Sequence, residues 1–219
     1  MKKNYHFVIF DWDGTLMDST ARIVSSMQQT ARIVDEQVPT VEAIKSTIGL
    51  SMEAVISQLF PIAGELLKTR IRDVYREQYV DKDQTPSPLF PGAMDLLRWL
   101  ESNNVKAAVA TGKARHGLSR ALTSVGLENY FEYSVCADEA TSKPHPEMVH
   151  RLLDLTGSDP DKTLVVGDSV HDINMAKNAR VDSIGVTTGA SSPQALGDLR
   201  PIAVLDCLTQ LKEKVKLLS

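Results

Sequence analysis

Short apolar runs recur along the chain at intervals that are too long for β-hairpins. They occupy residues 6–10, 105–110, 134–136, 163–166, 183–186 and 202–205. Apolar residues at helical spacing fill most of the intervals, which is typical of βαβ units and a parallel sheet. The runs are almost entirely apolar and do not alternate, as expected for strands that helices cover on both faces. The sequence therefore predicts an α/β fold built on a parallel sheet.

One interval departs from this rhythm and contains no convincing strand. Between residues 16 and 84, apolar residues recur at helical spacing, as at Ile23, Met27 and Ile33. Residues 81–92, DKDQTPSPLFPG, end this pattern, because their prolines and polar side chains stop a helix and suit a linker. We therefore expect an all-helical domain at residues 16–84, inserted into a core domain of residues 1–15 and 85–219.

The composition of the chain limits the classes of partner. Its 219 residues include 28 acidic and 24 basic side chains, for a formal charge of -4. Proteins that bind nucleic acid or an anionic membrane usually carry clustered Lys and Arg, so we expect neither partner. No stretch approaches the roughly 20 apolar residues that a membrane-spanning helix needs. We expect a monomer or a homodimer.

The two cysteines, Cys136 and Cys207, lie far apart in apolar surroundings. Their spacing matches neither a zinc site nor a dithiol motif, so we interpret them as reduced core residues. Reduced cysteines are typical of the cytosol, and we expect a cytoplasmic protein.

Polar side chains follow four of the predicted strands. In open parallel sheets ligands bind beyond the carboxyl ends of the strands, so these residues are the candidates for a site. In chain order they are Asp11, Asp13, Thr111, Gly112, Lys113, Lys143, Asp168, Ser169 and Asp172.

The carboxylates in this set suggest a metal. Asp11 and Asp13 are two positions apart on an extended chain, so their side chains can point the same way. With Asp168 and Asp172 nearby, mutual repulsion would raise their pKa values unless a cation neutralises them. Oxygen ligands favour a hard cation, and Mg²⁺ also binds substrate phosphate. Hydroxyl, ammonium and backbone N–H donors at the same edge indicate a bound anion, most simply phosphate.

Asp11 and Asp13 can take different roles in phosphate transfer, one as a nucleophile and the other as an acid and base. A carboxylate can act as a nucleophile and form an aspartyl phosphate. Asp11 leaves the strand first and is the most rigidly placed, which suits in-line attack. Asp13 could then protonate the leaving oxygen and later activate water.

Four motifs in chain order resemble those of one enzyme family. They are DWDGT at residues 11–15, AAVATG at 107–112, SKPHPE at 142–147 and GDSVHD at 167–172. Together they resemble the haloacid dehalogenase-like hydrolases, in particular the phosphoglycolate phosphatase-like branch, over nearly the whole chain. The resemblance implies a Rossmann-like parallel sheet core with an inserted, mobile helical cap. It also implies a Mg²⁺-dependent phosphatase that acts on a small phosphorylated metabolite.

The resemblance assigns a role to each motif residue. Asp11 would be the nucleophile and a Mg²⁺ ligand, and Asp13 the acid and base, with its backbone carbonyl on the metal. Thr111 would hold the phosphoryl group and Lys143 would offset its charge. Asp168, supported by Asp172, would complete the metal site.

Three positions depart from the family pattern. Trp12 replaces a small aliphatic residue, which we expect to alter packing rather than chemistry. Gly112 replaces an asparagine, so only its N–H can contact the phosphate. The dehalogenases proper lack an aspartate at the position of Asp13, which argues against carbon–halogen cleavage here.

Several residues have two interpretations. Gly49 and Ser51 interrupt the helical pattern, so their loop could read the substrate's leaving group, or Ser51 could cap a helix. Arg22 could contact substrate or lie on a solvated face. Ser169 and Asp172 could cap a helix that begins near Ile173, a role compatible with metal support.

Three further residues carry simpler expectations. We expect Lys113 to be solvated or a charge at the rim, since the sequence around it lacks the earlier glycine of a P-loop. His171 is expected to be an exposed loop residue. Asp18 is assigned to the start of the first helix after the DWDGT motif, where a negative charge suits the helix dipole.

Three alternatives to a phosphomonoester hydrolase are considered. An inorganic pyrophosphatase fits the same motifs. A phosphosugar mutase would need an acid and base partner in the insertion, at about the position that Ile23 occupies. A non-catalytic binding protein would be free to lose a motif residue, and none is missing.

Overall fold

The computed structural model describes residues 4–214, which contain a six-stranded parallel sheet with the strand order β3-β2-β1-β4-β5-β6. The strands are β1 (Phe7–Phe10), β2 (Lys106–Thr111), β3 (Tyr133–Cys136), β4 (Thr163–Gly167), β5 (Asp182–Val186) and β6 (Ala203–Leu205). Each apolar run of the sequence therefore forms a strand, and the predicted α/β fold is confirmed. The order reverses beside β1, which leaves a crevice at the carboxyl ends of β1 and β4.

Helices cover both faces of the sheet, as the unbroken apolar runs predict. In β1, Val8 and Phe10 belong to one buried cluster and Phe7 and Ile9 to the other. The first cluster includes helix α5 (Ala93–Ser102), α6 (Arg115–Ser124) and α10 (Leu211–Lys214). The second includes α7 (Glu147–Thr156) and α8 (Val170–Asn178). Shorter helical elements are η2 (Pro160–Lys162), α9 (Pro193–Asp198) and η3 (Leu208–Gln210).

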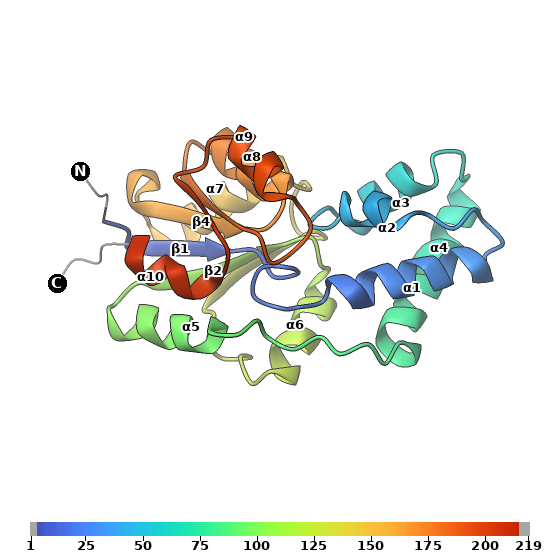
Figure 1. Ribbon diagram of the computed structural model, residues 1–219, viewed down its shortest axis with the longest axis horizontal. Coiled ribbons are helices and arrows are strands. Elements are labelled where there is room, and N and C mark those ends of the chain that lie inside the picture. Colours follow the sequence, from blue (N-terminus) through green and yellow to red (C-terminus); the bar gives the residue numbers. More distant parts are fainter. Residues whose placement is uncertain (1–3, 215–219) are drawn as a thin grey trace.

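The segment between β1 and α5 is helical and has its own buried cluster. Its elements are α1 (Thr20–Ile33), α2 (Val41–Lys45), α3 (Met52–Leu59), α4 (Glu65–Glu77) and a π-helical turn η1 (Gln78–Lys82). Met27, Ile44, Ile56 and Ile71 are among the side chains that pack together there. These helices lie beyond the carboxyl end of β1, away from the chain termini (Figure 1). The segment is therefore placed over the edge of the sheet that carries the candidate residues.

Two connections join this segment to the sheet, and they run side by side. Met17 forms an antiparallel bridge with Leu89, and the Asp18 N–H donates to the carbonyl oxygen of Pro88 at 2.8 Å. Asp18 is exposed and precedes Ser19, the N-cap residue of α1, so it lies outside the first helical turn. Its assignment to the start of the helix is wrong by about two residues.

Trp12 and the cysteines have different degrees of burial. Trp12 is fully buried, with its ring edge-on to Phe131 and its Nε1 donating to the sulfur of Met17 at 3.3 Å. Cys136 is buried, whereas Cys207 is only partly buried, so its assignment to the core is wrong. Neither forms a disulfide. Within residues 4–214, no helix has the length and apolar character that crossing a bilayer requires.

Candidate active site

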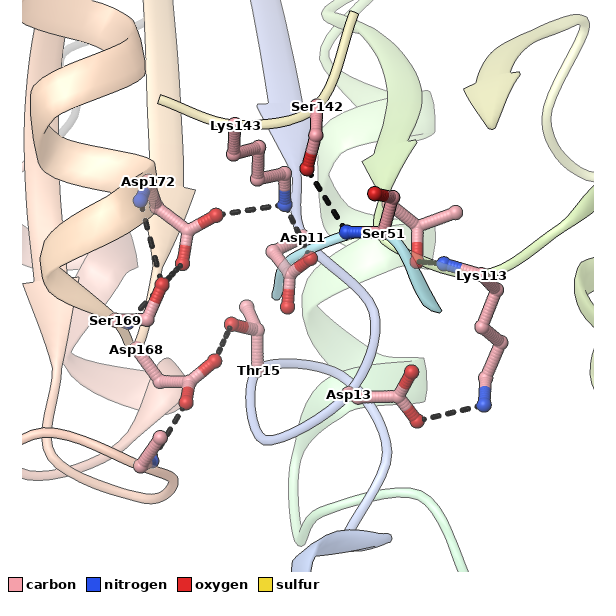
Figure 2. Close-up of polar contacts among 12 residues, drawn as sticks. Asp11, Asp13, Thr15, Ser51, Lys113, Ser142, Lys143, Asp168, Ser169 and Asp172 are labelled. Atoms are coloured by element: carbon pink, nitrogen blue, oxygen red, sulfur yellow. Dashed lines mark hydrogen bonds and ion pairs between the residues drawn. The ribbon is translucent and has the colours of Figure 1, made fainter. Parts of the chain in front are cut away.

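The carboxyl edge of the sheet collects buried charged side chains from four loops. They come from the loops after β1, β2, β3 and β4, and Figure 2 shows Lys143, Asp168 and Asp172 around Asp11, with Asp13 and Lys113 paired to one side. The most buried of them are Asp11, Lys143, Asp168 and Asp172, each no more than 3% exposed. Buried charges require partners, so their contacts indicate how the site is organised.

Asp11 stands at the centre of this group. Its backbone N–H donates to the carbonyl of Val166 at 2.9 Å, which ties it to β4. Its Oδ1 accepts a hydrogen bond from the ammonium group of Lys143, whereas Oδ2 is buried and has no hydrogen-bond partner among the described residues. Burial raises the pKa of Asp11 well above its ordinary value, Lys143 opposes this, and Asp172 and Asp168 add to it. One carboxylate oxygen is therefore held and the other is available.

Asp168 is held from two sides. Its Oδ1 accepts from the Thr15 hydroxyl at 2.7 Å, and its Oδ2 accepts from the Ala190 N–H at 2.7 Å. Burial and the Asp172 charge raise the pKa of Asp168 to about 7, against the hydrogen bonds from Ala190 and Thr15. Gly14 has φ +89, and a Cβ there would lie 2.5 Å from an Asp168 oxygen. The glycine of the DWDGT motif therefore provides both the turn and the space for this carboxylate.

Asp172 both caps a helix and positions a lysine. It forms a capping box with Ser169 at the start of α8, which begins at Val170 rather than near Ile173 as the sequence suggested. Its Oδ2 accepts from the Ser169 N–H at 3.0 Å, and its Oδ1 accepts from Lys143 Nζ at 2.7 Å. Both oxygens are thus occupied, and the capping and positioning roles coexist in one side chain.

The residues present fit a hard divalent cation. Asp11, Asp168 and Asp172 each offer an oxygen within 4.8 Å of the others, and all three are buried. The Oδ2 of Asp11 is buried beside this cluster with no hydrogen-bond partner among the described residues, so the site lacks positive charge that a bound cation would supply. Oxygen donors without imidazole or thiolate suit Mg²⁺. The Asp13 carboxylate is not part of this cluster. The expected contact of Asp13 with the metal is through its backbone carbonyl oxygen.

Asp13 points away from the other carboxylates (Figure 2). Its Oδ1 accepts from the Ser19 hydroxyl and lies 3.0 Å from Lys113 Nζ. The side chain of Lys113 is only 12% exposed, and its Nζ also donates to the Tyr79 hydroxyl at 3.2 Å. Of the two expectations for Lys113, a solvated side chain is wrong, because this ion pair and the Tyr79 ring cover it, whereas a charge at the rim of the sheet agrees with the structure.

The insertion supplies this cover through Tyr79 of η1. Lys113 Nζ lies 4.7 Å from the centroid of the Tyr79 ring, and the Arg22 guanidinium lies 5.0 Å from the same centroid. Arg22 is half-buried, so its alternative as a solvated residue is wrong. Cation–π contacts of this kind stabilise partly desolvated cations.

Thr111 and Gly112 end β2 at the same edge. Thr111 is fully buried, and its hydroxyl oxygen accepts from the Lys113 N–H at 3.1 Å. A Cβ at Gly112 would lie 2.7 Å from the carbonyl oxygen of Gly49 and closer still to that of Leu50. The backbone of the insertion therefore packs directly on Gly112, which a larger residue would prevent.

The loop that carries Gly49 and Ser51 reaches the site. Ser51 caps α3 by accepting from the Ala54 N–H at 3.3 Å, and its own N–H donates to the Ser142 hydroxyl at 2.8 Å. A Cβ on Gly49, whose φ is +95, would lie 3.2 Å from the Ser169 hydroxyl oxygen. The two interpretations of this loop, as a helix cap and as a segment close to the site, are compatible.

His171 also contacts the insertion. It lies in the first turn of α8 rather than in a loop, and its Nε2 is 2.9 Å from the carbonyl oxygen of Ser46. The expectation of an exposed loop histidine is therefore wrong. This contact and the Ser51 to Ser142 hydrogen bond join the insertion to helix α8, which follows β4, and to the loop after β3.

Sequence reasoning missed three supports of the site. Ser19 and Lys113 hold Asp13, and the Ala190 N–H holds Asp168. Lys113 is among the residues that follow the predicted second strand, but its ion pair with Asp13 joins two different loops and leaves no local pattern in the sequence. Ala190 lies in the loop after β5, and a backbone donor has no sequence signature.

Comparison with known proteins identifies the family. A family model described as haloacid dehalogenase-like hydrolase matches residues 8–186. The chain is 35% identical over 210 residues to "Probable phosphatase IndB" from Dickeya dadantii, covering 93% of this chain and 90% of that protein. It is 30% identical over 203 residues to a phosphoglycolate phosphatase from Agrobacterium fabrum, covering 90% of this chain and 87% of that one. It is 31% identical over 211 residues to the pyrophosphatase PpaX from Bacillus pumilus, covering 93% of each.

Solved structures share the fold. A hydrolase from Pseudomonas syringae superposes with a TM-score of 0.88 at 23% identity, covering 97% of this chain and 100% of that one. The family resemblance seen in the four motifs is confirmed. Because the family model matches most of the length of this chain, the chain belongs to the haloacid dehalogenase-like hydrolases.

Proposed function

We propose that the protein is a Mg²⁺-dependent phosphatase that hydrolyses small phosphorylated metabolites through an aspartyl phosphate on Asp11. Relatives named as phosphatases cover nearly the whole chain, which supports the phosphatase class. The single observation that carries the mechanism is the Asp11 carboxylate, which has one oxygen on Lys143 and the other buried without a hydrogen-bond partner among the described residues.

The free oxygen of Asp11 is the attacking atom in this proposal. A bond forms between Oδ2 and phosphorus while the bond from phosphorus to the substrate oxygen breaks. Lys143 stays between Asp11 and Asp172, where its charge offsets that of the incoming phosphoryl group. Thr111 and the Gly112 N–H are assigned to the phosphoryl oxygens. Mg²⁺ held by Asp11 and Asp168, with support from Asp172, would supply further positive charge to those oxygens.

Asp13 is assigned the proton transfers. It gives a proton to the leaving oxygen and then takes one from the water that attacks the aspartyl phosphate, which releases phosphate and restores Asp11. Ser19 and Lys113 hold its carboxylate on the side that faces the insertion. The side chain is 10% exposed, so the proton donor is largely shielded from bulk water.

The helical segment of residues 16–84 is assigned the role of a cap on a core of residues 1–15 and 85–219. Ser51, Tyr79 and the carbonyl groups of Gly49 and Leu50 all contact loops of the candidate site. A cap of this kind excludes water during the reaction and opens for product release. We assign the protein to the cytoplasm as a monomer or homodimer.

Two alternatives are less well supported. A phosphosugar mutase needs a proton carrier in the insertion, and the side chain near Asp13 at that position is the apolar Ile23. Pyrophosphate hydrolysis is favoured by the similarity to PpaX and uses the same carboxylates.

Phosphate release from a panel of phosphorylated metabolites tests the proposal. The wild type is expected to turn over with Mg²⁺ and to lose activity in EDTA. Asp11→Asn, which keeps the shape of the side chain, is expected to be inactive and folded by circular dichroism. Turnover that persists in Asp11→Asn overturns the mechanism, and no turnover of any ester with Mg²⁺ favours a binding protein instead.

A further inference from the structure

A cleft of about 280 Å³ lies between the helical insertion and the sheet, and Asp13 forms part of its wall. Lys113 and Gly112 line it from the core side, while residues of α1, α3 and α4 line it from the insertion. Because Asp13 is the residue assigned to the leaving oxygen, the group attached to that oxygen would enter this cleft.

The side of the cleft that the insertion supplies is largely apolar. Its half-buried members are Ile23, Leu50, Met52, Tyr75, Tyr79 and Val80. The rings of Tyr75 and Tyr79 are stacked, with centroids 5.8 Å apart. When an apolar ligand displaces water from surface of this kind, the free energy of binding becomes more favourable.

The charged side chains of the cleft are paired or exposed. Lys113 is paired with Asp13 at 3.0 Å, and Arg72 is paired with Glu53 at 3.4 Å. The other arginines that line the cleft, Arg76 and Arg120, are exposed. Among the described lining residues there is therefore no buried, unpaired cation for a carboxylate or a second phosphate. Arg22, whose buried Nε has no hydrogen-bond partner among the described residues, contacts the Tyr79 ring and does not line the cleft.

The volume of the cleft agrees with its chemistry. At 280 Å³ it equals the liquid share of about nine water molecules, at roughly 30 Å³ each. Glycolate and inorganic phosphate have five non-hydrogen atoms each, so even at one water volume per atom they would fill only about half of this space. A leaving group that fills the cleft is larger than either.

From these observations we infer the class of substrate: a phosphomonoester whose alcohol carries an uncharged, apolar or aromatic body next to the phosphate-bearing carbon. The inference rests on the proposed phosphatase function. It places phosphoglycolate and pyrophosphate among the poor substrates, because their leaving groups are small and anionic. Binding of the remote apolar body lowers the barrier to phosphate transfer only if the cleft holds it in the transition state.

A series of esters tests the inference. Phosphate release with Mg²⁺ is measured for straight-chain alkyl monophosphates from methyl to pentyl, for benzyl phosphate, for phosphoglycolate and for pyrophosphate. The alkyl alcohols have similar acidity, so differences within the series reflect binding rather than leaving-group chemistry. We expect kcat/KM to rise roughly three- to fourfold for each methylene group that the cleft buries. Benzyl phosphate is expected to exceed phosphoglycolate by about tenfold or more, since it buries several such groups.

A matched pair of variants locates the effect. Leu50 is half-buried in the cleft, whereas Leu66 is 88% exposed on α4 and does not line it. Leu50→Ala is expected to flatten the dependence of kcat/KM on chain length, and the chemically identical change Leu66→Ala is expected to leave that dependence as in the wild type. An equal slope in both variants contradicts the assignment of the cleft.

The outcomes separate this inference from the proposed function. Hydrolysis that is fastest with phosphoglycolate or pyrophosphate overturns the inference and leaves the phosphatase mechanism standing. Failure to hydrolyse any ester overturns both. A rising series that disappears in Asp11→Asn supports both.

Discussion

Lys113 and Asp13 form an ion pair across the carboxyl edge of the sheet, with Lys113 Nζ 3.0 Å from Asp13 Oδ1. The pair joins the loops after β2 and β1, and Tyr79 of the insertion contacts the same ammonium group. Burial opposes the charge on Lys113, but Asp13 and Tyr79 hold its pKa above the ordinary value. The lysine therefore stays charged and links the insertion to the carboxylate that we assign to proton transfer.

Lys113→Met is expected to reduce kcat by about tenfold or more, because Asp13 loses the partner that orients it and acid–base catalysis contributes at least about a hundredfold. Steady-state kinetics on one ester measures the change. Lys106→Met is the matched control, since Lys106 is exposed on β2 and its Nζ donates to the carbonyl oxygen of Thr156 at 3.3 Å, away from Asp13. Equal kcat values in the two variants would argue against a positioning role.

Asp168→Asn is expected to abolish stabilisation by Mg²⁺. A ligand that binds only the folded state raises the free energy of unfolding by about 2.7 kcal/mol at a hundred times its Kd. Removing one charge from the Asp11, Asp168 and Asp172 cluster weakens the attraction for the ion. Thermal unfolding with and without Mg²⁺ measures the difference. A rise in Tm as large as in the wild type would exclude Asp168 from the metal site.

Much of the fold could be predicted because its signals are local. Fully apolar runs such as residues 163–166 identify strands covered on both faces, and the rule that parallel strands place their carboxyl ends together brings Asp11 and Asp168 to one edge. The turn at Gly14 could be predicted locally as well, because a glycine directly after a strand lets the chain turn out of the sheet. These inferences need only the order of residues along the chain.

The contacts that the sequence did not reveal are long-range. Tyr79 meets Lys113 only because the insertion packs against the loop after β2, a placement that no local pattern contains. Ala190 supports Asp168 through its backbone N–H, which any residue except proline could supply. Asp172 both caps α8 and accepts a hydrogen bond from Lys143. The capping pattern in the sequence indicates only the first of these two roles.

Cys136 is expected to react slowly with thiol reagents in the folded protein. Burial raises the pKa of its thiol to about 12, and the side chain is fully buried. At pH 8 the thiol is therefore protonated and shielded, whereas Cys207 is partly exposed. A chromogenic disulfide reagent is expected to label one thiol rapidly, and both after unfolding. Cys207→Ser should remove the fast phase, and a fast phase that persists in this variant would contradict the burial of Cys136.

Gly112→Ala is expected to lower kcat/KM by about fivefold or more. The new Cβ would lie 2.7 Å from the Gly49 carbonyl oxygen, so the loop of the insertion must withdraw from the site. Overpacking of this kind typically costs about 1–3 kcal/mol, which corresponds to roughly 5-fold to 150-fold in a closure equilibrium. Gly197→Ala in α9 is the control, because a Cβ there meets nothing within 4 Å and alanine favours a helix. It should keep wild-type kinetics, and a Gly112→Ala enzyme with unchanged kcat/KM would mean that close packing of the loop on Gly112 is not needed for turnover.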